Sequence, residues 1–183
     1  MERQDLKDLL KASYMPQKKA ADYMDKRGYS YDPELSTMQQ KVFINKETGN
    51  PLITERGSKR VSDWLYEDPA GYLGYTNTTR VKQAKELAKA TKDKYGIDAT
   101  MVSHSLGGYL SEQAAKATPQ SEVYTYNKLA GLPSVFQKNP QNQYDYRTTL
   151  DIPSFLGQFQ SGGTKQNISG SWNPIASHDI EYL

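Results

Sequence analysis

The sequence contains no cysteine and only two histidines, His104 and His178, among its 183 residues. The absence of cysteine excludes a disulfide framework, a thiolate nucleophile and a cysteine-based metal site. Two histidines are too few for most zinc sites, so we expect no metal and no organic cofactor. No run of apolar residues approaches the ~20 residues that cross a bilayer.

Neither sign of charge dominates, because 23 Lys and Arg face 21 Asp and Glu, for a net charge of +2. Nothing in this balance calls for a nucleic-acid partner. The N-terminus is charged from Glu2 onward and lacks an apolar run, which predicts no signal peptide. We therefore expect a cytoplasmic or particle-associated protein, and the oligomeric state stays open.

The hydrophobic pattern divides the chain into a helical N-terminal extension, residues 1–38, and a main region, residues 39–183, within one structural domain overall. The extension has two short helical patterns separated by Pro16, and then a loop at 29–33. The tail from Ser154 is expected to be irregular. Alternation of strands and helices from residue 97 predicts an α/β fold with a mostly parallel sheet. Strands are expected at 41–45, 51–55, 98–102, 122–126 and 144–149, and helices at 61–66, 79–95 and 107–117.

The hexapeptide SHSLGG at residues 103–108 lies between the predicted strand 98–102 and a predicted helix. A sharp strand-to-helix turn that carries a serine needs small residues two places before and after it, and Ser103 and Gly107 occupy those places. The usual pattern is G-x-S-x-G, so Ser103 is a departure. Ser105 is therefore the candidate nucleophile, and the N–H of Leu106 is an oxyanion donor by the geometry of such a turn. The alternative is a glycine-rich turn with a surface serine.

A serine hydroxyl needs a neighbouring base, and only His104 or His178 can supply it. His104 adjoins Ser105 on a sharp turn, where neighbouring side chains diverge, so His178 is the candidate base. Asp151 follows a predicted strand at the carboxyl end of the sheet and is the candidate acid. Asp179 adjoins the base and Asp145 lies at the start of its strand, which disfavours both. The order Ser, Asp, His agrees with that of α/β-hydrolases.

Four blocks resemble the class 3 lipases, a branch of the α/β-hydrolase fold. They are residues 54–58 followed by Asp63 and Trp64, the turn around Ser105, the strand at 123–126, and residues 146–153. The resemblance covers roughly residues 40–183. It implies a compact class 3 lipase-like core with flanking helices, and it makes the N–H of Ser58 the second oxyanion donor. The short interval before the acid fits a pared-down, virus- or phage-encoded member.

The resemblance implies a serine hydrolase that cleaves carboxylic esters of lipids, as a triacylglycerol lipase or phospholipase does, through an acyl-enzyme. Trp64, Tyr66 and Tyr72 are candidate substrate-binding residues in loops, where they could line an acyl groove or contact a membrane periphery. One alternative is a soluble short-chain esterase or acyltransferase. Another is a non-catalytic structural or virion-associated protein that retains the fold.

Overall fold

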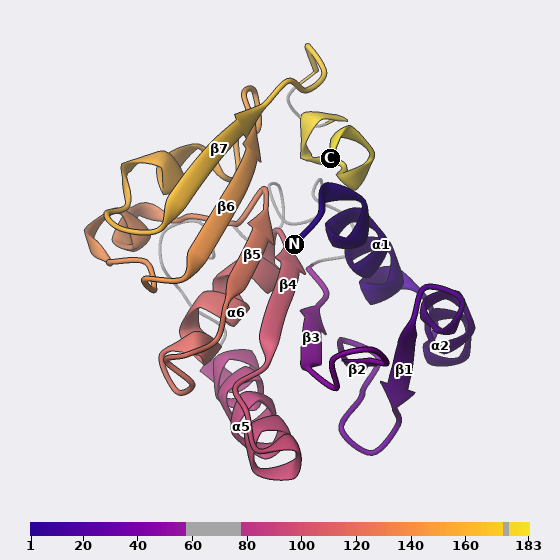
Figure 1. Ribbon diagram of the computed structural model, residues 1–183. Coiled ribbons are helices and arrows are strands. Elements are labelled where there is room, and N and C mark those ends of the chain that lie inside the picture. Colours follow the sequence, from indigo (N-terminus) through magenta and orange to yellow (C-terminus); the bar gives the residue numbers. More distant parts are fainter. Residues whose placement is uncertain (58–77, 174–175) are drawn as a thin grey trace.

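The computed structural model describes residues 1–57, 78–173 and 176–183. Its strands form a seven-stranded sheet in which each strand lies beside its neighbours in sequence (Figure 1). The first three strands pair antiparallel, and every pairing from the third strand to the seventh is parallel. The strands are β1 (Tyr29–Asp32), β2 (Gln40–Asn45), β3 (Pro51–Glu55), β4 (Thr100–His104), β5 (Val123–Tyr126), β6 (Gln143–Thr148) and β7 (Thr164–Ile168).

Helices cover both faces of this sheet. Those described are α1 (Arg3–Tyr14), α2 (Gln17–Asp25), α5 (Thr78–Tyr95) and α6 (Leu106–Ala115), with 3₁₀ turns at Leu132–Phe136, Phe155–Phe159, Ala176–His178 and Ile180–Tyr182. None of the helices in the described ranges is long and apolar enough to cross a membrane. The mostly parallel α/β sheet predicted from the sequence is confirmed, as are the two antiparallel strands β2 and β3. The expected helix at 61–66 lies outside the described residues.

Two apolar clusters hold the layers together, because consecutive residues of a strand point to opposite faces of the sheet. Phe43 and Val102 face α1 and α2, whereas their neighbours Val42 and Met101 face α5 and α6. The α1 helix is fully part of this core, since three of its leucines are at most 1% exposed. Burial of each leucine stabilises the fold by roughly 1.5–3 kcal/mol. They are Leu6, Leu9 and Leu10.

Two sequence-based expectations were wrong, and both concern edge strands. Residues expected as a loop form β1, which pairs antiparallel with β2 and buries Tyr29 and Asp32. The tail, expected to be irregular, contains β7, which pairs parallel with β6 although four of its five residues are exposed. Backbone hydrogen bonds to a neighbouring strand create such edges, and they leave little hydrophobic pattern in the sequence.

Candidate active site

Ser105 occupies a sharp turn between β4 and α6, as the sequence predicted. Its backbone torsions are φ 57° and ψ −127°, a region that L-residues rarely adopt. Such a conformation costs on the order of 1–3 kcal/mol and persists only where the surroundings enforce it. Here the carbonyl of Ser105 accepts hydrogen bonds from the N–H groups of Gly108 and Leu129, at 3.0 Å each. The hydroxyl forms no capping hydrogen bond to α6, so it is not committed to holding the helix.

Small residues are required around this turn because the backbones of β3 and α6 approach each other closely there. A Cβ atom on Gly107 would lie 2.2 Å from the carbonyl oxygen of Glu55, at the end of β3. Two residues before Ser105, Ser103 replaces the usual glycine and is fully buried, and its Oγ lies 2.5 Å from Oγ of Ser111 on α6. A hydroxymethyl group is thus accommodated between strand and helix because α6 supplies a hydroxyl partner.

Asp151 and His178 form a buried pair, as expected for an acid and a base. Oδ1 of Asp151 lies 2.6 Å from Nδ1 of His178, and each residue is 1% exposed. The second carboxylate oxygen of Asp151 accepts the N–H of Ser154 at 2.9 Å. Among the described residues, Nε2 of His178 is buried and has no hydrogen-bond partner. A buried nitrogen without a partner is unusual in a folded protein and marks a place where a reacting group can bind.

The backbone beside His178 is fastened to the sheet. The carbonyl of Ser177 accepts hydrogen bonds from Asn127 Nδ2 at 2.9 Å and from Thr148 Oγ1 at 2.6 Å. Asn127 follows β5, and its side-chain oxygen also accepts the N–H of Thr148, the last residue of β6. The loop that carries His178 is therefore anchored at the carboxyl ends of β5 and β6, and the second of these strands leads directly to Asp151.

His104 has a different set of partners from His178. Its Nε2 lies 2.8 Å from the carbonyl oxygen of His178, and its Nδ1 lies 2.7 Å from the hydroxyl of Tyr14. Burial, together with the adjacent His178, lowers the pKa of His104 well below its usual range. The interpretation that His104 is badly placed to act as the base agrees with this geometry, since both ring nitrogens are occupied.

Neither rival acid contacts the base. Asp145 is buried next to Thr125 and Lys128, at 2.6 Å and 3.1 Å. Asp179 is exposed and accepts the N–H of Glu181 at 3.1 Å. Of the three candidate carboxylates, Asp151 is the one that meets an imidazole nitrogen.

The oxyanion region is described in part. Leu106 begins α6, and the first N–H groups of a helix have no partner within it. A Cβ on Gly57 would lie 3.0 Å from Cβ of Ser105, so the end of the β3 segment lies against the turn. Ser58, Trp64, Tyr66 and Tyr72 fall outside the described residues. Their roles in oxyanion stabilisation and substrate binding stay predictions.

Glu55 is a buried ionisable residue that the sequence analysis did not single out. Its Oε1 accepts a hydrogen bond of 2.5 Å from Gln40, while Oε2 is buried without a partner among the described residues. Burial raises the pKa of Glu55 to about 7, although the amide of Gln40 and the charge of Arg80 oppose this shift. The carboxyl group directly behind the serine turn therefore titrates near neutral pH.

Sequence reasoning also missed Tyr14, Asn127 and Thr148, which hold the two histidines in place. None of them stands in a recognisable motif. Their partners are 90, 50 and 29 residues away, respectively, along the chain. Only the spacing of α1, which puts Tyr14 on the last turn of an amphipathic helix, gives any local indication.

Comparison with protein-family models finds no match, and comparison with curated proteins finds none either. Solved structures do match. Lip2 lipase from Yarrowia lipolytica aligns with 95% of this chain and 80% of its own length, at 13% identity and a TM-score of 0.58. A fungal lipase aligns with 98% of this chain and 81% of its own length, at 17% identity and a TM-score of 0.54.

These similarities agree with the resemblance to class 3 lipases noted from the four sequence blocks, and they extend over the N-terminal helices as well. At such low identity they establish the fold and leave the reaction to be tested. The parallel strands, the helices on both faces and the strained serine after β4 are the features of that fold present here. The chain has the lipase-like α/β-hydrolase fold.

Proposed function

We propose that this protein is a serine hydrolase that cleaves carboxylic esters of lipids through an acyl-enzyme. The observation that carries the proposal is the buried pair of Asp151 and His178, whose Nε2 has no partner among the described residues. The centroid of this imidazole lies 4.6 Å from that of His104, the residue directly before Ser105, and the two rings are tilted by 46°. The proximity of His178 to the residue before Ser105, at the carboxyl end of β4, supports a triad of Ser105, His178 and Asp151.

In this mechanism Oγ of Ser105 attacks the ester carbonyl while Nε2 of His178 accepts the hydroxyl proton. Asp151 holds the proton of His178 on Nδ1, so that Nε2 is the basic atom, and it stabilises the imidazolium that forms. The N–H groups of Leu106 and Ser58 receive the developing oxyanion, and each such donor contributes about 3 kcal/mol. His178 then gives its proton to the leaving alcohol, and a water molecule activated by the same base releases the acid.

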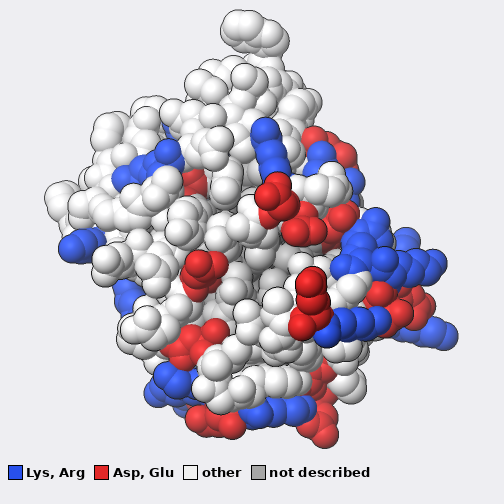
Figure 2. All heavy atoms as spheres, in the orientation of Figure 1, with Lys and Arg blue, Asp and Glu red and all other residues white. Residues whose placement is uncertain are grey.

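A lipid surface is the proposed site of action, because apolar side chains are exposed beside the acid and the base. Leu150 and Ile152 flank Asp151 and are 40% and 50% exposed, and Trp172, in the loop that leads to His178, is 95% exposed. In Figure 2 the region of β7 and its terminal loop shows few charged side chains, whereas these gather around α1, α2 and α5. Exposed indole and aliphatic groups without neighbouring charge favour peripheral contact with lipid.

Labelling with a fluorophosphonate tests the catalytic assignment. We expect one adduct, on Ser105, and its loss in Ser105→Ala, while Ser30→Ala, a matched change at an exposed serine in β1, labels like the wild type. An adduct on another serine would refute the assigned nucleophile. No adduct on the wild-type protein would favour a non-catalytic structural or virion-associated role.

Substrate class is tested separately with p-nitrophenyl esters of increasing acyl length and with liposomes. We expect highest activity on medium or long chains, and a blue shift of Trp172 fluorescence on lipid in a Trp64→Phe background, since the chain has two tryptophans. A sharp preference for acetate without lipid binding would instead identify a soluble esterase. Transfer of the acyl group to an added alcohol in preference to water would identify an acyltransferase.

A further inference from the structure

The α1 helix ends at Tyr14, whose side chain reaches the serine turn. The helix is held there by Lys41, which is fully buried and donates to the carbonyl of Ser13 at 2.6 Å. A cation at the last turn of a helix is stabilised by the unsatisfied carbonyls of that end. The position of Tyr14 is therefore fixed from β2 as well as by the packing of α1 in the core.

The hydroxyl of Tyr14 joins two parts of the site. It lies against Gly57, the residue before Ser58, since a Cβ atom on Gly57 would lie 3.0 Å from the hydroxyl oxygen. Burial raises the pKa of Tyr14 to about 12, so the phenol keeps its proton at neutral pH. That proton is directed to Nδ1 of His104, at 2.7 Å. The ring of Tyr14 also meets the imidazole edge-on, with centroids 5.9 Å apart.

The carbonyl of His178 determines which nitrogen of His104 carries a hydrogen. A carbonyl only accepts, so the neutral ring has its hydrogen on Nε2, which donates to that carbonyl at 2.8 Å, and Nδ1 accepts from Tyr14. A continuous chain of hydrogen bonds thus runs from Tyr14 through His104 to the backbone of His178.

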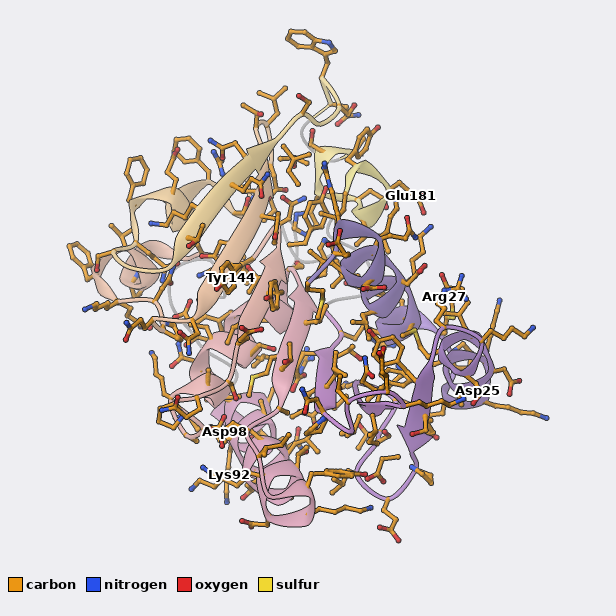
Figure 3. All side chains as sticks on the ribbon, in the orientation of Figure 1. Asp25, Arg27, Lys92, Asp98, Tyr144 and Glu181 are labelled. Carbon is orange, nitrogen blue, oxygen red and sulfur yellow. The ribbon has the colours of Figure 1, made fainter. Side chains whose placement is uncertain are left out.

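The segment after the base is also attached to α1. Lys11 forms an ion pair of 3.4 Å with Glu181, and Lys7 donates to the carbonyl of Glu181 at 2.9 Å. Figure 3 shows Glu181 beside α1, and Figure 1 shows the C-terminus next to the same helix. The exposed ion pair contributes little alone, whereas the bond from His104 to the carbonyl of His178 is buried.

We infer that Tyr14 and His104 are positioning residues that hold the backbone of His178, and with it the imidazole, in register with Ser105. The inference rests on the proposed function, because it concerns the base of that same site. It also gives the N-terminal helix a role in catalysis, through a hydroxyl group that touches neither the substrate nor the reacting atoms. A displacement of about 1 Å at a catalytic group can reduce the rate about a hundredfold.

The test compares Tyr14→Phe with Tyr23→Phe. Tyr23 lies on α2 and donates a 2.5 Å hydrogen bond to Asp8 of α1, so each variant removes one tyrosine hydroxyl from this region. Only Tyr14→Phe breaks the chain of hydrogen bonds to His178. We expect Tyr14→Phe to lower kcat and the rate of fluorophosphonate labelling about tenfold to a hundredfold with KM nearly unchanged. Tyr23→Phe should leave both rates unchanged. Equal labelling of Tyr14→Phe and wild type would overturn the inference.

A second variant covers the case in which Tyr14→Phe does not fold. His104→Gln keeps one donor and one acceptor, whereas His104→Leu removes both, so the labelling rate of the glutamine variant should exceed that of the leucine variant. Equal rates in these two variants would also overturn the inference.

Nitrogen-15 spectra separate this inference from the proposed function, because the chain has only two imidazole rings to assign. The wild-type spectrum should show His104 with hydrogen on Nε2 and an Nδ1 resonance shifted by the hydrogen bond from Tyr14, and Tyr14→Phe should lose that shift. A wild-type protein with this tautomer that neither labels nor hydrolyses esters would refute the proposed function, and the positioning role with it. Active protein with hydrogen on Nδ1 of His104 would refute the positioning role alone.

Discussion

Two carboxylates of the β6 segment, Asp145 within the strand and Asp151 just after it, are both buried but have opposite surroundings. Both carboxylate oxygens of Asp145 accept hydrogen bonds. Lys128 and Asn139 donate to Oδ2 at 3.1 Å and 2.9 Å, and Thr125 donates to Oδ1 at 2.6 Å. Asp151 meets the ring of His178, whose far nitrogen has no partner among the described residues. Full satisfaction stabilises a core, whereas a withheld partner leaves a group that can act on a ligand.

Lys128, the cation beside Asp145, also has all of its hydrogen-bond donors used. Its ammonium has three donors and lies within 3.1 Å of three acceptors, from Glu112, Asn139 and Asp145. Lys128 is 4% exposed and Glu112 1% exposed, so all three donors of the ammonium are used by buried protein acceptors. We interpret the cluster of Lys128, Glu112 and Asp145 as structural, in contrast to the pair of Asp151 and His178.

The largest effect is expected from Asp151→Asn, which removes the charge that orients His178. We expect kcat for ester hydrolysis to fall about 10⁴-fold with little loss of stability, because the amide favours the wrong imidazole tautomer. Asp145→Asn, within β6, is the matched control. It should alter the free energy of unfolding while the rate per folded molecule stays near that of the wild type. An equal loss of rate in the two variants would contradict a structural role for Asp145 and a catalytic role for Asp151.

Replacement of Lys128 by methionine should mainly affect stability. The change leaves Glu112 and Asp145 as buried carboxylates without their cation, which costs about 3–5 kcal/mol of unfolding free energy. Urea denaturation measures the loss, and fluorophosphonate labelling of the folded fraction should proceed at the wild-type rate. A stable but unreactive variant would mean that the cluster serves the active site directly.

Glu55 is intermediate between the two arrangements, because one of its oxygens is satisfied and the other is not. Its pKa is raised to about 7 by burial, so the folded protein binds this proton more tightly than the unfolded chain does. The stabilisation is present below pH ~4.5 and is lost as the pH rises through ~7, by on the order of 3 kcal/mol. Urea denaturation between about pH 5 and pH 8 measures this loss. Glu55→Gln should flatten that dependence, and Glu47→Gln, at an exposed hairpin position, should not.

The smallest effect is expected from Ser105→Gly, and its sign is opposite. Glycine adopts φ 57° without the strain that serine bears. The free energy of unfolding should therefore rise by about 1–3 kcal/mol in the variant, although the proposed nucleophile has been removed. Thermal or urea denaturation detects this gain. A destabilised variant would show that the hydroxyl of Ser105 contributes more to folding than its backbone geometry costs.

Much of this site could be predicted from the sequence. The turn around Ser105 is encoded locally, by an apolar strand before it, a helix after it and a glycine at the point of closest approach. The pairing of His178 with Asp151 was accessible because the chain offers only two histidines and because the carboxyl ends of parallel strands meet at one edge.

The sequence by itself therefore determined the α/β class and the serine turn, and it predicted the contact between Asp151 and His178. Only the tertiary structure decided that β1 and β7 extend the sheet, that Tyr14 reaches His104, and that Asn127 and Thr148 hold the loop of the base. The physical reason is the separation along the chain over which each kind of interaction acts. Periodicity and turn chemistry act within about ten residues, whereas edge pairing and buried hydrogen bonds join residues that meet only after the core has formed.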